Sequence, residues 1–307
     1  MNEVPSGAWP VMLTPYRADS SVDLDVLDRY TDWLIAQGSA GLFPTALSGE
    51  MFELSETERL DIARRVVVRA GGRVPVVAAV SEPGTAEETA AAVRRMAATG
   101  VDAVALIASV VLAEDDDEQR LRDTVEAVIA ANPDTALGIY ECPLPYHRLL
   151  SLEAVSWLAH TGRFVFFKET SHDVSVMADR VSAASGTPLK VFNAGIENLV
   201  QSLAIGVAGL SGWIVNVYPD LIDRLTSGAL ESDEALRLQI ALEQAERAMA
   251  PTYPASAKAL VDSRAGIGFL PVGRWRPSGI DPAALAQLAA ALEGVAATTA
   301  ATPSRAT

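Results

Sequence analysis

The stretch FVFFKET, residues 164–170, decides how the rest of the chain is interpreted. Phe and Val favour the pleated, buried surface of a sheet, so this apolar run predicts a core β-strand. Lys168 at its end is unexpected, because lysine is rarely buried unpaired and a desolvated amine loses its proton more easily. The stretch therefore predicts either an amine nucleophile for a carbonyl substrate, or a strand-end lysine that pairs with Glu169 or faces water.

The segments on both sides repeat this pattern of a short apolar run followed by a longer amphipathic run. The short runs predict eight strands, at residues 9–13, 41–45, 75–80, 102–108, 136–140, 164–168, 189–193 and 207–211. A helical stretch follows each strand; the one at 55–70 begins with a capping-box pattern, Ser55 and Glu58. Eight strand–helix units in order are typical of a (β/α)8 barrel, or TIM barrel, within the α/β class. An open doubly wound sheet is the alternative, but no Gly-x-Gly-x-x-Gly turn follows an early strand.

Further helical stretches follow the eighth unit, at 232–248, 255–264 and 281–292. We therefore expect the barrel to occupy residues 1–228, with a C-terminal helical extension, 229–295, packed on it. The last segment, 296–307, consists mostly of Ala, Thr, Ser and Pro. It has little apolar surface to bury, so the sequence predicts a disordered tail.

The composition excludes several classes of partner. The chain has 39 acidic and 24 basic residues, and its net charge of -15 repels phosphate backbones and anionic lipid. We therefore expect neither a nucleic-acid nor a membrane partner. Cys142 is the single cysteine, so no internal disulfide is possible. The N-terminus lacks a signal-peptide pattern and no apolar run reaches the ~18 residues that span a bilayer, so we expect a cytoplasmic protein.

In a barrel of this kind the active site lies at the C-terminal ends of the strands. Tyr140 ends the strand before that of Lys168, and neighbouring strands lie about 4.8 Å apart, so the phenol and the amine can face each other. The amine would attack a ketone, and the phenol would carry the proton that leaves with the carbinolamine oxygen as water. Alternatively, Tyr140 only caps the barrel core with its hydroxyl in water.

Other strand ends carry further candidates for substrate binding. The turn Leu47-Ser48-Gly49-Glu50 offers backbone amides and a hydroxyl to the carboxylate of a 2-oxo acid, or is an ordinary turn held by local hydrogen bonds of Glu50. Thr14 and Ser211 end the first and the last strand. His147 and Arg148 lie in the loop 143–150, which either contacts the substrate or has no role. No His or Cys pair has metal-ligand spacing, so we expect no metal site.

These residues together resemble a known family. They are, in order, Leu13-Thr14-Pro15, Ser48-Gly49-Glu50, Tyr140 with Pro143, Lys168-Glu169, Gly209-Leu210-Ser211 and Asn216. Over residues 7–225 their spacing resembles the dihydrodipicolinate synthase / N-acetylneuraminate lyase family. The resemblance implies a class I, Schiff-base, pyruvate-handling barrel in which Lys168 forms the imine, Tyr140 shuttles protons, and Ser48 with Gly49 grips the carboxylate. It also implies a homo-oligomer, a tetramer or dimer, and no metal or organic cofactor.

The chain departs from the synthase pattern at three places. Leu47 replaces a hydroxyl that relays a proton in the synthases. The run 108–111, Ala-Ser-Val-Val, has no phenol where the synthases carry tyrosines. Pro145 stands in place of an arginine that binds the second substrate, and Arg148 lies three residues further on. These departures argue against true dihydrodipicolinate synthase activity but leave the imine step intact.

We therefore expect a lyase or aldolase that makes or breaks the C3–C4 bond of a 2-oxo acid, such as pyruvate, through a lysine imine and enamine. A 2-oxo acid and an aldehyde are the expected small-molecule partners. One alternative is a dehydratase of 2-oxo-3-deoxy sugar acids, because an imine also assists loss of a β-hydroxyl. The other is a non-catalytic relative that only binds a 2-oxo acid.

Overall fold

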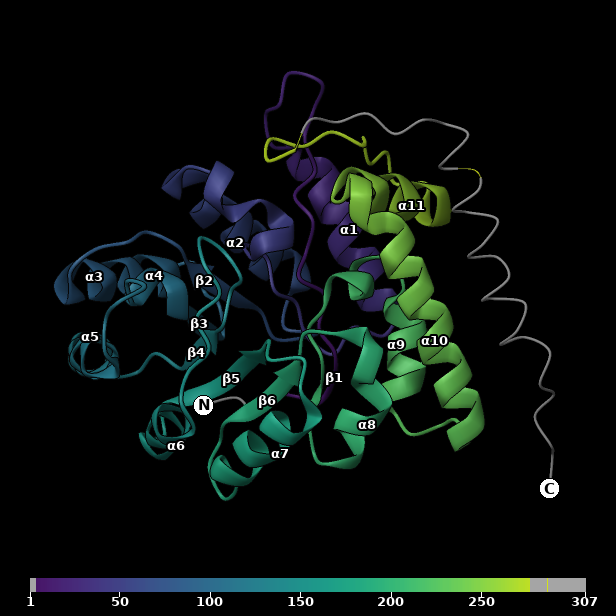
Figure 1. Cartoon of the computed structure of the whole chain (residues 1–307). Coiled ribbons are helices and arrows are strands. Elements are labelled where there is room, and N and C mark those ends of the chain that lie inside the picture. Colours follow the sequence, from purple (N-terminus) through teal and green to yellow (C-terminus); the bar gives the residue numbers. More distant parts are fainter. Residues whose placement is uncertain (1–3, 277–285, 287–307) are drawn as a thin grey trace.

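A computed structural model describes residues 4–276 and 286. Seven parallel strands form a curled sheet in the middle of the molecule (Figure 1). The sheet order is β1-β7-β6-β5-β4-β3-β2, so the sheet follows the chain apart from its first strand. The strands are β1 (Gly7–Ala8), β2 (Val77–Val80), β3 (Ala103–Ile107), β4 (Leu137–Tyr140), β5 (Phe164–Glu169), β6 (Lys190–Asn193) and β7 (Gly209–Leu210).

Helices alternate with these strands and surround the sheet, which gives a TIM-barrel-like α/β fold (Figure 1). The predicted capping box of Ser55 and Glu58 is present at the start of α2. Among the described residues, no helix is long and apolar enough to span a bilayer. The helices are α1 (Leu24–Ala36), α2 (Glu56–Ala70), α3 (Ala86–Ala97), α4 (Ala108–Val111), α5 (Glu118–Ala131), α6 (Leu152–His160), α7 (Val174–Ala183), α8 (Leu199–Ala204), α9 (Pro219–Thr226), α10 (Ser232–Met249) and α11 (Ala255–Ala265).

The prediction of eight regular strands was wrong at the start of the chain. The first strand covers Gly7–Ala8 instead of 9–13, and the segment predicted as a strand at 41–45 makes only a parallel bridge from Leu42 to Val76. Both predicted segments contain a proline, Pro10 and Pro44, which has no N–H to donate to a regular ladder.

The segment around Leu42 nevertheless hydrogen-bonds to the chain on both sides of it. On one side the N–H of Phe43 donates to Pro10 O at 3.0 Å, and the N–H of Met12 donates to Phe43 O at 2.9 Å. On the other side the N–H of Leu42 donates to Pro75 O at 2.9 Å, and that of Val77 donates to Leu42 O at 2.9 Å. This irregular segment therefore lies between the two ends of the seven-stranded sheet.

Aromatic rings fill the interior of the curled sheet. Phe166 on β5 packs against Trp9, Phe43 and Phe192, with ring centroids 5.0, 5.7 and 4.7 Å away. All four side chains are fully buried. This layer forms an apolar floor directly before Lys168, two residues further along the same strand.

The C-terminal helices belong to the same hydrophobic core as the first strand–helix units. Leu242 of α10 and Leu260 of α11 are buried in one cluster with Leu13, Leu27 and Ile214. Helices α10 and α11 thus confirm two of the predicted helices beyond the eighth unit. The predicted helix 281–292, apart from residue 286, and the predicted tail 296–307 lie outside the described residues.

Candidate active site

Lys168 and Tyr140 face each other at the ends of neighbouring strands. The sheet register pairs their Cα positions directly across β4 and β5. The Lys168 Nζ atom lies 4.6 Å from the centroid of the Tyr140 ring. Only 5% of Lys168 and 3% of Tyr140 are exposed. Side chains alternate along a strand, so Phe166 and Lys168 point to the interior while Glu169 points outward.

Burial changes the acid–base properties of this pair. It lowers the pKa of Lys168 to about 8, because the ammonium group loses its hydration, and nearby anionic groups oppose the effect only partly. Burial also raises the pKa of the Tyr140 phenol well above its usual range. Near neutral pH the site therefore presents a neutral phenol beside an amine that gives up its proton far more readily than an exposed lysine.

A cavity of about 500 Å³ opens above Lys168. Five of the residues predicted for the site line it: Lys168, Tyr140, Ser48, Leu47 and His147. The other lining residues are Val11, Pro143, Thr170, His172, Ala194, Trp213, Ala250, Tyr253, Trp275 and Arg276. The cavity thus brings together the predicted nucleophile, the predicted proton carrier and the predicted carboxylate-binding hydroxyl.

Thr14 and Gly49 support the turn that carries Ser48, without lining the cavity. Leu47–Gly49 form a single turn of 3₁₀-helix, and the Thr14 hydroxyl donates to Gly49 O at 2.6 Å. A Cβ atom on Gly49 would lie 2.9 Å from Met12 O, so a larger residue would displace the turn. Both residues therefore fix where the Ser48 hydroxyl lies.

Glu50 ties the same turn to the end of the described chain. Its fully buried carboxylate accepts a hydrogen bond from Lys258 Nζ at 2.6 Å. The backbone N–H groups of Arg274 and Trp275 also donate to it, at 2.5 and 2.8 Å. Long-range contacts of the Glu50 carboxylate therefore hold this turn in addition to its local backbone hydrogen bonds.

Besides Thr14 and Gly49, three further predicted binding residues lie away from the cavity lining. Ser211 and Leu210 are fully buried around the end of β7, where the Ser211 N–H donates to Asn193 O at 2.7 Å. The guanidinium of Arg148 donates to Glu114 O at 2.9 Å and to Asp116 O at 2.8 Å, which holds it at the outer side of its loop. Arg148 therefore does not supply a cation to the cavity.

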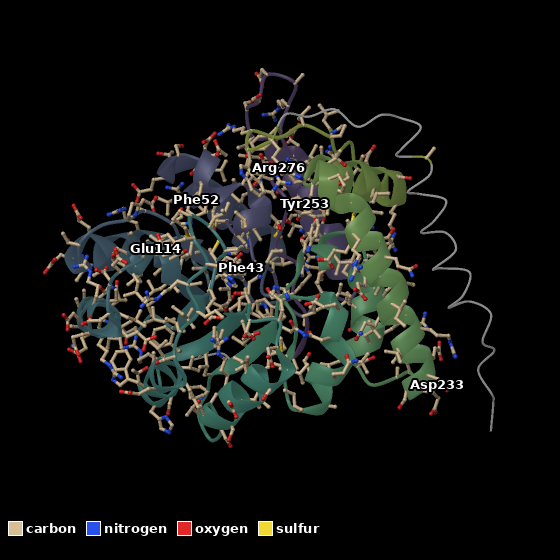
Figure 2. The ribbon with its side chains drawn as sticks, in the orientation of Figure 1. Phe43, Phe52, Glu114, Asp233, Tyr253 and Arg276 are labelled. Atoms are coloured by element: carbon tan, nitrogen blue, oxygen red, sulfur yellow. The ribbon has the colours of Figure 1, made fainter. Side chains whose placement is uncertain are left out.

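The sequence reasoning missed side chains that reach the cavity from the C-terminal segment. Tyr253, Trp275 and Arg276 line it, although no local motif marks them. Figure 2 shows Tyr253 between the C-terminal helices and the middle of the molecule, where Phe43 lies. His172 also lines the cavity; its Nδ1 lies 2.6 Å from Glu197 Oε1, and this hydrogen bond raises the pKa of the imidazole.

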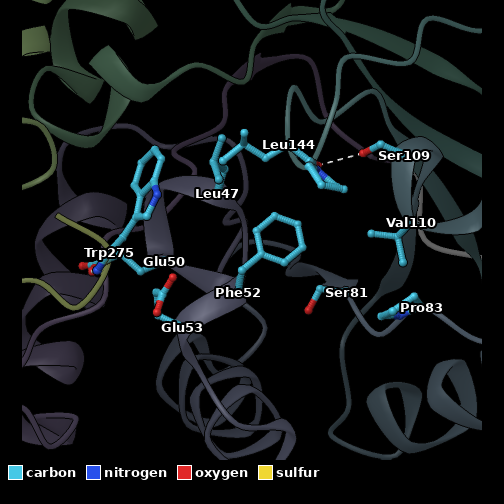
Figure 3. A pocket seen from close by; sticks show the side chains of 11 residues that line it. Leu47, Glu50, Phe52, Glu53, Ser81, Pro83, Ser109, Val110, Leu144 and Trp275 are labelled. Carbon is cyan, nitrogen blue, oxygen red and sulfur yellow. Dashed lines mark hydrogen bonds between the residues drawn. The ribbon is translucent and has the colours of Figure 1, made fainter. Parts of the chain in front are cut away.

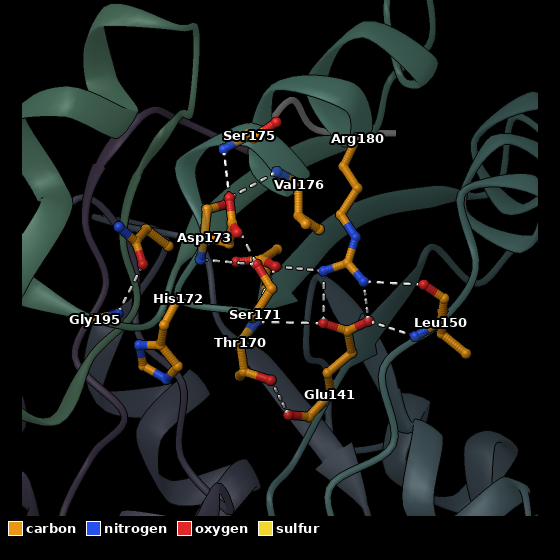
Figure 4. Close-up of polar contacts among 12 residues, drawn as sticks. Glu141, Leu150, Thr170, Ser171, His172, Asp173, Ser175, Val176, Arg180 and Gly195 are labelled. Carbon is orange, nitrogen blue, oxygen red and sulfur yellow. Dashed lines mark hydrogen bonds and ion pairs between the residues drawn. The ribbon is translucent and has the colours of Figure 1, made fainter.

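A buried ion network joins Arg180 to Glu141 (Figure 4). Arg180 of α7 binds Glu141 through both guanidinium nitrogens, at 2.9 and 2.8 Å, and also pairs with Glu169. Glu141 follows Tyr140 and Glu169 follows Lys168, so one guanidinium holds both strand ends in place. All three charged side chains are at most 3% exposed.

A second, mostly apolar cavity of about 390 Å³ adjoins the first one (Figure 3). Leu47 and Trp275 line both cavities, and Phe52, Val110 and Pro145 add further apolar surface. Its lining residues include no Lys, Arg or His. The positions where the sequence departs from the synthases thus form a carbon-rich surface beside the site, without a cation for a second carboxylate.

Comparison with known proteins identifies the group to which this chain is related. Residues 4–261 match the profile described as the dihydrodipicolinate synthetase family. The chain belongs to this family. Its enzyme class is therefore that of the class I aldolases and lyases. Among the described residues no group of three or more His, Cys, Asp or Glu side chains is placed to hold a metal ion.

Relatives of this dihydrodipicolinate synthetase family member include both named enzymes and uncharacterised ones. An uncharacterised DapA-like lyase of Halobacterium salinarum is 31% identical over 230 residues, 74% of this chain and 73% of the relative. A 4-hydroxy-tetrahydrodipicolinate synthase of Roseobacter denitrificans is 28% identical over 76% of this chain and 78% of its own. The family is therefore settled, while the relatives differ in what is known of their substrates.

Solved structures of the family show the same fold. Dihydrodipicolinate synthase DapA-2 of Bacillus anthracis superposes with a TM-score of 0.84 at 19% identity, covering 95% of this chain and 99% of its own. YagE of Escherichia coli, a prophage protein solved in complex with pyruvate, superposes with a TM-score of 0.80 at 21% identity, covering 95% and 98%. At these identities the likeness concerns the fold alone.

Proposed function

We propose that this family member is an imine-forming lyase or aldolase that acts on pyruvate or a related 2-oxo acid, with Lys168 as the nucleophile. The observation that carries the proposal is the buried Lys168 amine, 4.6 Å from the centre of the Tyr140 ring, at the base of a cavity. A desolvated amine beside a neutral phenol is suited to attack a ketone and to manage the protons of that reaction.

The first step joins the Lys168 nitrogen to C2 of the 2-oxo acid. The nitrogen lone pair forms the C–N bond, the carbonyl oxygen takes up a proton from Tyr140, and the phenol regains a proton from the nitrogen. The oxygen takes up a second proton, the one that the Lys168 ammonium released when it became the reactive amine, and leaves as water with the electrons of the C–O bond, which gives a protonated imine. That cation draws electrons from C3, so the C3–C4 bond breaks or forms through an enamine.

The remaining lining residues hold the substrate for this chemistry. The Ser48 hydroxyl, placed by Thr14 and Gly49, would bind the carboxylate. His147 lines the same cavity, with its Nε2 2.8 Å from the Thr170 hydroxyl, and would contact the part of the substrate beyond C3. In this arrangement Lys168 and Tyr140 would act between the carboxylate and the reacting bond.

Borohydride reduction in the presence of pyruvate tests the proposal. The reduced imine would add a stable adduct, and mass spectrometry of peptides would locate it among only three lysines, Lys168, Lys190 and Lys258. We expect the adduct on Lys168. Lys258 is held in a fully buried ion pair with Glu50, so an adduct there or on Lys190 would contradict the assignment.

The pH dependence of imine formation is a second expected result. The pKa of Lys168 is lowered to about 8, so the reactive uncharged amine increases as the pH rises and is the major form above about pH 8. The rate of adduct formation at saturating pyruvate should therefore rise from pH 6 and level off above about pH 8. A rate that continues to rise toward pH 10.4, the ordinary pKa of lysine, would show that the amine is not desolvated.

A further inference from the structure

Tyr253 brings a second phenol into the proposed site from outside the strand–helix units. It precedes α11 in the C-terminal extension, and only 6% of it is exposed. Its side chain lines the same cavity as Lys168, Tyr140 and Ser48. The proton-carrying groups named so far do not include it.

The Tyr253 side chain is held at both ends. Its ring packs edge-on against Trp213, with centroids 4.3 Å apart and an interplanar angle of 88°. Its hydroxyl accepts a hydrogen bond from Asn216 Nδ2 at 3.1 Å. Ser48 lines the same cavity and lies close enough to lower the pKa of the Tyr253 phenol, so the fixed phenol is a neighbour of the hydroxyl proposed to bind the carboxylate.

Imine formation requires two proton transfers from nitrogen to oxygen. Conversion of a Lys168 ammonium and a ketone into a protonated imine and water moves two protons from nitrogen to oxygen, without net gain or loss. Tyr140 alone would have to carry both in succession. Leu47, the side chain next to Ser48, has no hydroxyl, and the run 108–111 has no phenol.

We propose that Tyr253 is the second proton-carrying phenol of this site and acts through the hydroxyl of Ser48. This inference rests on the proposed function. One of the two protons passes from the Lys168 nitrogen by way of Ser48 and Tyr253 and returns to the departing oxygen, while Tyr140 carries the other. Both phenols end the step in the form in which they began it.

The charge state of the two phenols agrees with this role. Burial raises the pKa of Tyr253 above its usual range, and hydrogen bonds with Ser48 and Asn216 oppose the rise. Negative charge on Tyr253 would in turn raise the pKa of Tyr140, so the two rings lie close enough to influence each other. Each phenol is therefore neutral at rest and can donate one proton while it accepts another.

Tyr253→Phe removes the hydroxyl and keeps the ring against Trp213. Single-turnover trapping with borohydride at saturating pyruvate should show imine formation slowed about 100-fold, the lower range for loss of a proton-transfer group. The affinity for pyruvate should change little, and the melting temperature should fall only modestly, because Asn216 Nδ2 loses one hydrogen-bond acceptor. Tyr218→Phe is the matched control, because Tyr218 is 5% exposed, packs against Arg264 and does not line the cavity.

The outcomes separate this inference from the proposed function. Wild-type trapping on Lys168 with an equally fast Tyr253→Phe variant overturns the role of Tyr253 and leaves the imine chemistry standing. No wild-type adduct overturns both. If Tyr253→Phe does not fold, a fluorinated tyrosine of the same shape and lower pKa at this position should change the rate of imine formation at a fixed pH; an unchanged rate also overturns the role.

Discussion

Lys168→Met is expected to abolish both the borohydride adduct and turnover of any 2-oxo acid substrate. Removing a covalent nucleophile lowers the rate by a factor on the order of 10⁵–10⁶. The folded state should not be weakened, because methionine fits beside the apolar floor of Phe166 and Phe192. The change also removes a buried amine that contacts the ring of Tyr140 but forms no ion pair with an acidic side chain among the described residues. Steady-state kinetics, peptide mass spectrometry and a melting curve check the three parts.

Lys190→Arg is the control for this experiment. It removes another of the three lysines, at the start of β6, and should retain the adduct and the activity of the wild type. Turnover by Lys168→Met above a few hundredths of the wild-type rate would mean that another group carries the chemistry. An intact rate with no adduct in the wild type would mean that the reaction does not pass through an imine.

Arg180→Met is expected to cost about 3–5 kcal/mol of the free energy of unfolding, the range for removing one partner of a buried ion pair. The loss is large because Glu141 and Glu169 would remain buried together without their cation. The same change should impair catalysis, since Arg180 holds the residues that follow Tyr140 and Lys168. Urea denaturation and single-turnover trapping measure the two effects.

The pH dependence of this loss follows from the carboxyl groups. Burial raises the pKa of Glu141 to about 7 even with Arg180 present, and removal of the guanidinium can only raise it further. A carboxyl with a raised folded-state pKa destabilises the protein as the pH rises from its unfolded value, near 4.3, through its folded value. The cost should therefore be largest above pH 7 and shrink toward pH 4.5.

An exposed pair provides the control for this variant. Arg64→Met breaks the contact with Asp61 on the surface of α2, where both side chains are 53% exposed. Such pairs contribute about 0–1 kcal/mol, with little dependence on pH. An Arg180→Met variant as stable as Arg64→Met would contradict the view that the buried network holds the two strand ends.

The strand ends of the site could be predicted from sequence because they follow a local rule. The apolar run before Lys168 and the regular order of strand–helix units place the lysine and Tyr140 on neighbouring strands at one edge of the sheet. The structure has this pairing in direct register. The same rule failed at Pro10 and Pro44, because the hydrophobic pattern does not take into account that proline lacks the backbone N–H that a regular strand ladder needs.

The rest of the cavity could not be predicted, because chain contacts across hundreds of residues form it. Tyr253 and Trp275 belong to segments that the sequence describes only as a helical extension. Arg148 has the charge expected for a substrate contact, but its guanidinium is hydrogen-bonded to the backbone carbonyls of Glu114 and Asp116 and does not line the cavity. The spacing of residues within a short segment does not show which distant segments it contacts. The family resemblance therefore suggested roles only for residues at motif positions.

The ion pair between Glu50 and Lys258 joins residues that are 208 positions apart. On a ribosome, the turn that carries Ser48 is therefore made long before its partner exists. Until Lys258 has been synthesised, the nascent chain must keep the Glu50 carboxylate in water, because burying an unpaired charge is costly. The turn that carries Ser48 therefore reaches its folded surroundings only after the segment with Lys258 is present.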